Sequence, residues 1–226
     1  MRTASIGSLF PMMAIAAGET PGAQDESLWQ YDETTDTGYY GFVPASDFIS
    51  GDELSSQLNF SVGTNQNSDA GWLKFYVGPA AVCNSTPGTA KVLFVAKKTL
   101  RIVTWLNING TNLLSGNRTI SIEDLQYKVR ILTGGGSSPG TNSEWNELMY
   151  RVHVDQPEGK SNWALFINID LWVGPNLNGR NTLVQDRWAG TGDGVVNRGN
   201  TGISSWNGMF WGWNGGWRPV LEYYET

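Results

Sequence analysis

The chain has 226 residues, a formal net charge of −6, a pI near 4.8 and only 16% charged residues. This length is sufficient for one domain with its own hydrophobic core, or for one domain and an arm. The acidic balance disfavours nucleic acid as a partner, because phosphate binding needs a basic surface. One cysteine, Cys83, and one histidine, His153, exclude an intrachain disulfide and metal sites built from several such residues.

The charge divides the chain into two parts. Residues 1–73 carry ten acidic residues and one basic residue, which leaves this segment at −9 and residues 74–226 at +3. The segment begins with an apolar stretch, residues 6–17, that is too short to span a bilayer. We therefore expect an acidic N-terminal arm over residues 1–46, with residues 1–20 packed on a neighbouring chain. The alternative is that this terminus packs on its own domain, residues 47–226.

From residue 47 onward the pattern predicts short strands and helices. Ser50 is a suitable N-cap for a first helix, and Thr104 precedes Trp105 and Ile108 at helical spacing, which predicts a second. Strands are expected where apolar residues alternate with polar ones or form short runs between charges: residues 71–77, 91–97, 119–122, 125–132 and 216–223. The third and fourth of these strands are expected to pair as a hairpin.

A further helix is expected to begin just before residue 145. Thr141 and Glu144 have the spacing of a capping box, in which each side chain satisfies a backbone amide of the other. We therefore predict that Glu144 is a capping residue, and that Trp145 lies in the core together with Trp105. Arg218 precedes a proline in the last strand, and we predict a buried guanidinium that ties loops together.

The densest feature is the aromatic run WNGMFWGWNGGW at residues 206–217. Its rings are separated by Gly and Asn, which favour turns, and they are too many to face one small core. Exposed rings on rigid loops suit sugar rings or protein partners, because they supply contact area at little entropic cost. The predicted ligand-binding residues are Trp206, Asn207, Phe210, Trp211, Trp213 and Asn214. Trp217 is expected to face the core, and the alternatives for the run are contact with another subunit or internal packing.

Six sequence blocks resemble, in the same order, proteins of tailed-bacteriophage virions that are described as tail or structural proteins. The blocks are DFISG (47–51), GWLKF (71–75), KVLFVAKK (91–98), YKVRILTG (127–134), SEWNELMY (143–150) and GWRPVLE (216–222). The resemblance covers about residues 47–225. It implies a virion component, in which the N-terminal arm would fix the domain to other virion proteins.

A more distant likeness is to the formylglycine-generating-enzyme branch of the C-type-lectin fold. The counterparts here are Thr104-Trp105, Val129-Arg130, Glu144-Trp145, Arg198-Gly199 and Trp217-Arg218. The oxygen-activating chemistry of that family needs paired cysteines near the C-terminus, whereas Cys83 is single and lies in a different region. The likeness implies the fold and argues against the activity.

Two other kinds of site have only part of their residues in this chain. His153, Asp155 and Ser161 supply the residue types of a hydrolase, but the chain has no Gly-x-Ser-x-Gly sequence. Asp193, between two glycines, has a calcium-ligand character, but hard cations need several clustered oxygens. We expect no catalytic residue, no metal site and no cofactor.

The sequence thus predicts an α+β, C-type-lectin-like domain with short strands, two main helices and long loops, preceded by an extended arm. We expect a bacteriophage virion structural protein, displayed as a head decoration, fibre or tail adhesin, that binds host or environmental ligands through its aromatic loops. It would be assembled in the bacterial cytoplasm, form homo-oligomers, and bind neither nucleic acid nor membrane. The alternatives are a free carbohydrate-binding lectin-like module and, more remotely, a formylglycine-generating-type enzyme.

Overall fold

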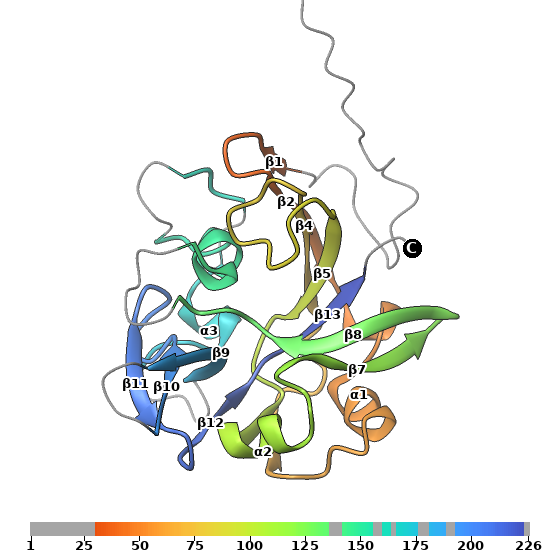
Figure 1. The fold of residues 1–226 in the computed structure, drawn as a ribbon, viewed down its shortest axis with the longest axis vertical. Helices are drawn as coiled ribbons and strands as arrows, with labels where there is room; N and C mark the ends of the chain where they lie inside the picture. Colours follow the sequence, from red (N-terminus) through yellow and green to blue (C-terminus); the bar gives the residue numbers. More distant parts are fainter. Residues whose placement is uncertain are drawn as a thin grey trace, which may run out of the picture.

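Two β-sheets organise the part of the chain that the computed structural model describes, which is residues 30–135, 142–155, 160–163, 166–175, 181–188 and 193–223 (Figure 1). The seven-stranded sheet has the order β1 (Gln30–Asp32), β2 (Thr37–Val43), β4 (Trp72–Val77), β5 (Lys91–Ala96), β13 (Pro219–Tyr223), β8 (Leu125–Ile131), β7 (Ser115–Ile122). The six-stranded sheet has the order β11 (Trp206–Phe210), β10 (Gly194–Arg198), β9 (Thr182–Trp188), β12 (Asn214–Trp217), β6 (Arg101–Thr104), β3 (Thr64–Asn65).

Neighbouring strands are antiparallel throughout, except that β9 and β12 meet in a parallel bridge between Thr182 and Gly216. The helices are short: η2 (Ala45–Asp47), α1 (Gly51–Gln57), α2 (Trp105–Gly110), the π-helix η3 (Trp145–Met149) and α3 (Asn168–Leu171). The described residues therefore form an α+β protein that is built mostly of strands.

The inner strands β4, β5 and β13 of the seven-stranded sheet are buried on both faces. Alternate residues of β5 enter different cores, with Phe94 in the core of Trp105 and Trp217, and Leu93 in the core of Trp145. Strand β4, which the sequence pattern predicted to be half-buried, is likewise buried at every residue except Tyr76. The pattern missed this because helices and the second sheet cover both sides of the strand.

Several local predictions are confirmed. The Ser50 hydroxyl accepts a hydrogen bond from the Glu53 amide at 3.1 Å, and the Thr104 hydroxyl accepts one from the Asn107 amide at 3.1 Å, so both caps form. The predicted hairpin is β7–β8. Trp105 is 2% exposed and Trp145 is fully buried.

The predicted last strand is divided at Arg218, which is fully buried. Residues before it belong to the six-stranded sheet and residues after it to the seven-stranded sheet. Its guanidinium donates to the carbonyl oxygens of Ala96, Lys97 and Leu171. The chain therefore crosses between sheets at an arginine that bonds to two separate segments, residues 96–97 and residue 171, which confirms the predicted structural role.

The predicted division between residues 46 and 47 does not hold for residues 30–46. Strand β2 pairs with β4, and Tyr39, Tyr40 and Val43 of β2 are buried. This part of the expected arm is thus an inner strand of the larger sheet, because its aromatic residues complete the two cores. The predicted anchor, residues 1–20, lies outside the described residues.

Candidate functional site

The aromatic run forms the edge strand β11 and the turn that leads from it to β12. Strand β11 pairs with β10 from Trp206 to Phe210, and the Trp213 amide then donates to the Phe210 carbonyl at 2.9 Å, which closes a tight turn. The Trp211 amide donates to the carbonyl of Asp193, at the start of β10, at 3.1 Å. Figure 1 places β10 and β11 together at the edge of the molecule, away from β7 and β8.

The turn presents the most exposed apolar side chains of this region. Trp213 is 65% exposed and Phe210 is 46% exposed, while Trp211 is partly buried between them and the core. Leu106, at the start of α2, is 44% exposed, and its amide donates to the Trp211 carbonyl at 3.4 Å. We call Leu106, Phe210, Trp211 and Trp213 the aromatic surface.

The six predicted site residues do not all meet at this surface. Asn214 is exposed and directly follows Trp213. Trp206 and Asn207 lie at the other end of β11, about 10–13 Å away from Phe210 along an extended strand. Trp217 is fully buried, as predicted. The sequence predicted loops for this run. Instead, residues 206–210 form a strand that pairs with β10, and this long-range pairing keeps Trp206 and Asn207 apart from Phe210.

Trp211 is held in place by the core beneath it. Its ring stacks on that of Trp105, with ring centroids 6.4 Å apart and planes within 17°. The Trp105 indole nitrogen donates to the Val184 carbonyl at 3.1 Å. The guanidinium carbon of Arg187 lies 5.6 Å from the Trp211 ring centre and 5.9 Å from that of Trp105. The aromatic surface therefore rests on a stack that is anchored in the core, so its rings are presented at low entropic cost.

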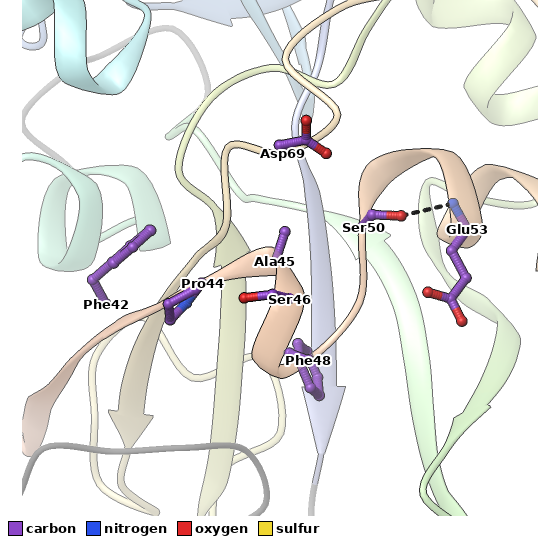
Figure 2. Close-up of a pocket in the computed structure, with 8 residues that line it drawn as sticks. All are labelled: Phe42, Pro44, Ala45, Ser46, Phe48, Ser50, Glu53 and Asp69. Atoms are coloured by element: carbon purple, nitrogen blue, oxygen red, sulfur yellow. Dashed lines mark hydrogen bonds between the residues drawn. The ribbon is translucent and has the colours of Figure 1, made fainter.

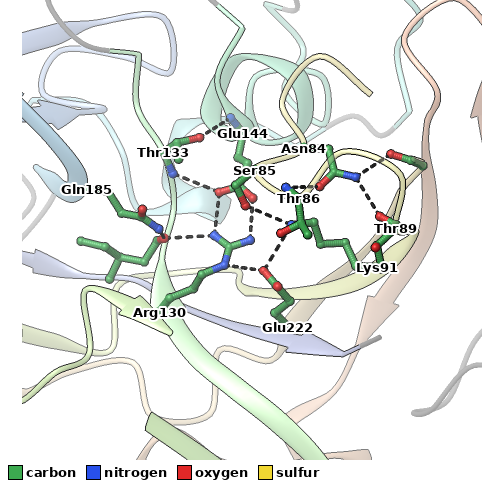
Figure 3. A network of polar contacts seen from close by, with 12 residues as sticks. Asn84, Ser85, Thr86, Thr89, Lys91, Arg130, Thr133, Glu144, Gln185 and Glu222 are labelled. Atoms are coloured by element: carbon green, nitrogen blue, oxygen red, sulfur yellow. Dashed lines mark hydrogen bonds and ion pairs between the residues drawn. The ribbon is translucent and has the colours of Figure 1, made fainter. Parts of the chain in front are cut away.

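A buried ionic network lies among β5, β8, β13 and η3 (Figure 3). Arg130 donates to both carboxylate oxygens of Glu144, at 2.7 and 2.5 Å, and to Glu222 at 2.6 Å. Lys91 lies 3.6 Å from Glu222. Two cations thus balance two anions in a region shielded from water.

The capping box predicted for Thr141 and Glu144 depends on Thr141, which lies outside the described residues. Within the described residues, the Glu144 carboxylate pairs with Arg130 and accepts from the Thr133 amide at 3.0 Å. The sequence did contain a signal for this pair: Arg130 lies in an apolar strand, and a buried arginine needs an acidic partner nearby.

The electrostatics of the network follow from this pairing. Burial alone would lower the pKa of Arg130, but Glu144 and Glu222 outweigh it and raise that pKa. Burial alone would raise the pKa of Glu222, but the charges of Arg130 and Lys91 outweigh it and lower that pKa. All four groups are more than nine-tenths buried, and Lys91 and Glu222 also line a pocket of about 190 Å³.

Two further buried arginines flank Trp145. The guanidinium carbons of Arg198 and Arg218 each lie 5.8 Å from its ring centre. Burial lowers the pKa of Arg198 to about 10 and that of Arg218 to about 9. Arg198 donates to the Asn146 side chain, in the same π-helix as Trp145. The arginines thus connect η3 to β10 and to the crossing between the sheets.

A pocket of about 570 Å³ lies beside η2 and α1 (Figure 2). Its lining residues are Phe42, Pro44, Ala45, Ser46, Phe48, Ser50, Glu53 and Asp69. A second hollow, of about 540 Å³, lies across α1, lined by polar side chains that include Asp52, Asn65 and Arg101. Asp52 accepts a hydrogen bond from Asn65 at 2.7 Å, and Arg101 donates to backbone carbonyls, so these groups are occupied within the protein.

The described residues form neither a hydrolase site around His153 nor a calcium site. His153 is buried, its Nδ1 accepts from the Asp155 amide at 2.9 Å, and burial lowers its pKa. Across the described ranges, no group of three or more His, Cys, Asp or Glu side chains has an arrangement that could hold a metal ion. Asp186 instead accepts from the amides of Gly134 and Gly135. None of the helices in these ranges has the length and apolar character needed to cross a membrane.

No family model, no curated protein and no solved structure matches the chain.

Proposed function

We propose that this chain is a structural and adhesive component of a tailed-bacteriophage virion. In this proposal a C-type-lectin-like domain binds a ligand on the host or in the environment through the aromatic surface. Residues 1–20 would attach the domain to other virion proteins, and the domain would act by binding rather than by catalysis.

The observation that carries the binding role is the exposure of Trp213 and Phe210 on an anchored support. Rings that served only to fill the core would be buried, whereas the side chains of Trp213 and Phe210 are 65% and 46% exposed. The stacking of Trp211 on Trp105 holds the turn beneath them. Large rings fixed in solvent are typical of surfaces that bind sugars or proteins.

The lectin-like fold is supported by the meeting of residues from separate blocks. Arg130 pairs with Glu144, and Arg198 and Arg218 both lie against Trp145. These residues come from four of the five blocks that resemble the formylglycine-generating branch. Their convergence is what a shared core would produce, and it uses the arginines as structural rather than catalytic groups.

A free carbohydrate-binding module is the alternative function, and it would use the same aromatic surface. A formylglycine-generating-type enzyme is a more remote one, because Cys83 is buried and burial raises its thiol pKa to about 12. The first alternative is separated from the virion role by location. A mass-spectrometric inventory of purified heads and purified tails should contain the chain, whereas its absence from both would favour the free module.

The adhesive role is tested with the double variant Phe210→Ala/Trp213→Ala. Because both side chains are exposed, we expect its melting temperature to stay close to that of the unmodified chain. Adsorption of particles to host cells, or binding of the purified chain to host glycans, should be abolished.

The matched control is Val82→Ala/Ile169→Ala, which removes two apolar side chains of similar exposure, 52% and 47%, at other places. It should adsorb normally. A large fall in melting temperature for Phe210→Ala/Trp213→Ala with adsorption intact would show that the cluster is core and that the adhesive proposal is wrong.

A further inference from the structure

Arg187 is an exposed cation beside the aromatic surface, and it has no acidic partner. It lies on β9 opposite Val195, and its guanidinium rests against the rings of Trp211 and Trp105. It forms no salt bridge or hydrogen bond with another residue of the described part of the chain. A guanidinium group is planar and carries five N–H donors, and here they remain available to a ligand.

The two acids nearest to Arg187 in the sequence do not neutralise it. Asp186 points to the opposite side of β9, where its carboxylate accepts from the Gly134 amide at 2.5 Å. Asp193 uses its main-chain carbonyl to accept from Trp211, and its side chain forms no ion pair with Arg187. In a chain with a net charge of −6, a cation without an acidic partner in the described part of the chain thus lies over Trp211, the partly buried ring of the aromatic surface.

The size of the surface favours a saccharide over a protein partner. The exposed parts of Leu106, Phe210 and Trp213 amount to on the order of 300 Å², well below the roughly 800 Å² that each partner contributes to a standard protein interface. A sugar ring fits a surface of this size. Asn214 adds an exposed amide next to Trp213, which is suited to a hydroxyl group.

We propose that the ligand of the aromatic surface is an acidic saccharide. The saccharide would contact the rings of Phe210, Trp211 and Trp213, and its carboxylate or sulfate group would accept hydrogen bonds from Arg187. Planar guanidinium groups bind such anions through two parallel hydrogen bonds. This inference rests on the proposed function, because it names the ligand class of the same surface.

The test compares acidic and neutral sugars on the full chain by titration calorimetry. Sialyllactose against lactose examines a carboxylate, and a 6-sulfated galactoside against the unsulfated one examines a sulfate. At least one acidic sugar should bind about tenfold or more tightly than its neutral counterpart, and added salt should weaken it. The pair of sugars with the larger difference in affinity identifies the anion.

Variants separate Arg187 from general charge. Arg187→Gln should remove the preference for the acidic sugar, and Arg187→Lys should restore only part of it, because lysine keeps the charge but loses the planar donors. Lys98→Gln is the control, since it changes the net charge equally at a side chain that lies over Trp172 instead. It should bind like the unmodified chain.

The outcomes distinguish this inference from the function on which it rests. Equal binding of neutral and acidic sugars, lost in Phe210→Ala/Trp213→Ala and unaffected by Arg187→Gln, would overturn the acidic ligand and leave the adhesive role standing. Binding of an acidic peptide but of no saccharide would also overturn it. Adsorption that survives Phe210→Ala/Trp213→Ala would overturn both proposals.

Discussion

At the scale of single residues, this protein uses arginines as internal connectors. Arg130, Arg151, Arg198 and Arg218 are each at most 4% exposed. Each one bonds to segments far apart in the sequence, as when Arg151 pairs with Asp32 at 2.7 Å and lies 3.7 Å from the ring centre of Trp163. Short strands and long loops supply few local constraints, and the guanidinium groups, each with several donors, connect them.

Replacing Trp145 with alanine should strongly destabilise the fold. The change empties a fully buried site and removes the ring that Arg198 and Arg218 contact. We expect a loss of about 3–5 kcal/mol in the free energy of unfolding, measured in urea, and a similar loss for Trp105→Ala. Trp213→Ala, at an exposed ring, should change it by less than about 0.5 kcal/mol. Equal stability of all three variants would contradict this assignment of core and surface.

The network also predicts how stability responds to acid. Because the folded pKa of Glu222 is below its ordinary value of 4.5, this carboxylate stabilises the folded state above that pH and loses the contribution as pH falls through the folded value. Glu222→Gln should lower stability at neutral pH by about 1–3 kcal/mol and flatten the acid dependence of urea unfolding.

At the scale of elements, the β10–β11 pair decides how the aromatic surface is presented. Gly208 of β11 lies against the ring of Trp188, and a methyl group there would overlap that ring. Gly202, in the preceding loop, has open space around the same position. The hairpin therefore depends on the close contact between Gly208 and Trp188, whereas Gly202 makes no comparable contact.

Gly208→Ala should destabilise the protein by about 1–3 kcal/mol, because Trp188 must leave its place. Ligand binding by the turn that follows should weaken as well, since β11 positions Phe210. Gly202→Ala should leave both the unfolding free energy and the binding near their unmodified values. Unchanged stability in Gly208→Ala would show that Trp188 moves freely and does not support the hairpin.

At the scale of the whole molecule, one sheet separates two cores and both depend on an N-terminal strand. Tyr40 and Val43 of β2 belong to one core, and Tyr39 of the same strand belongs to the other. Removing residues 1–20 should therefore leave a folded, soluble chain that no longer joins the particle. Removing residues 1–46 should prevent folding, as judged by circular dichroism and solubility. Normal incorporation of the shorter truncation would contradict the anchoring role.

The sequence by itself determined the local features of this protein. The caps at Ser50 and Thr104, the β7–β8 hairpin and the burial of Trp105 and Trp145 all follow from residues close together in the chain. Propensity and periodicity report such short-range preferences directly. The α+β character followed from the same signals.

Only the tertiary structure decided the long-range pairings. It joined β2 to the central sheet, paired Glu144 with Arg130, and separated Trp206 from Trp213 by the length of β11. It also placed Arg187 on the stacked rings of Trp211 and Trp105. Which distant segments meet depends on how both cores close around shared strands, and no window of sequence contains that information, because the partner of each strand is set by the whole chain.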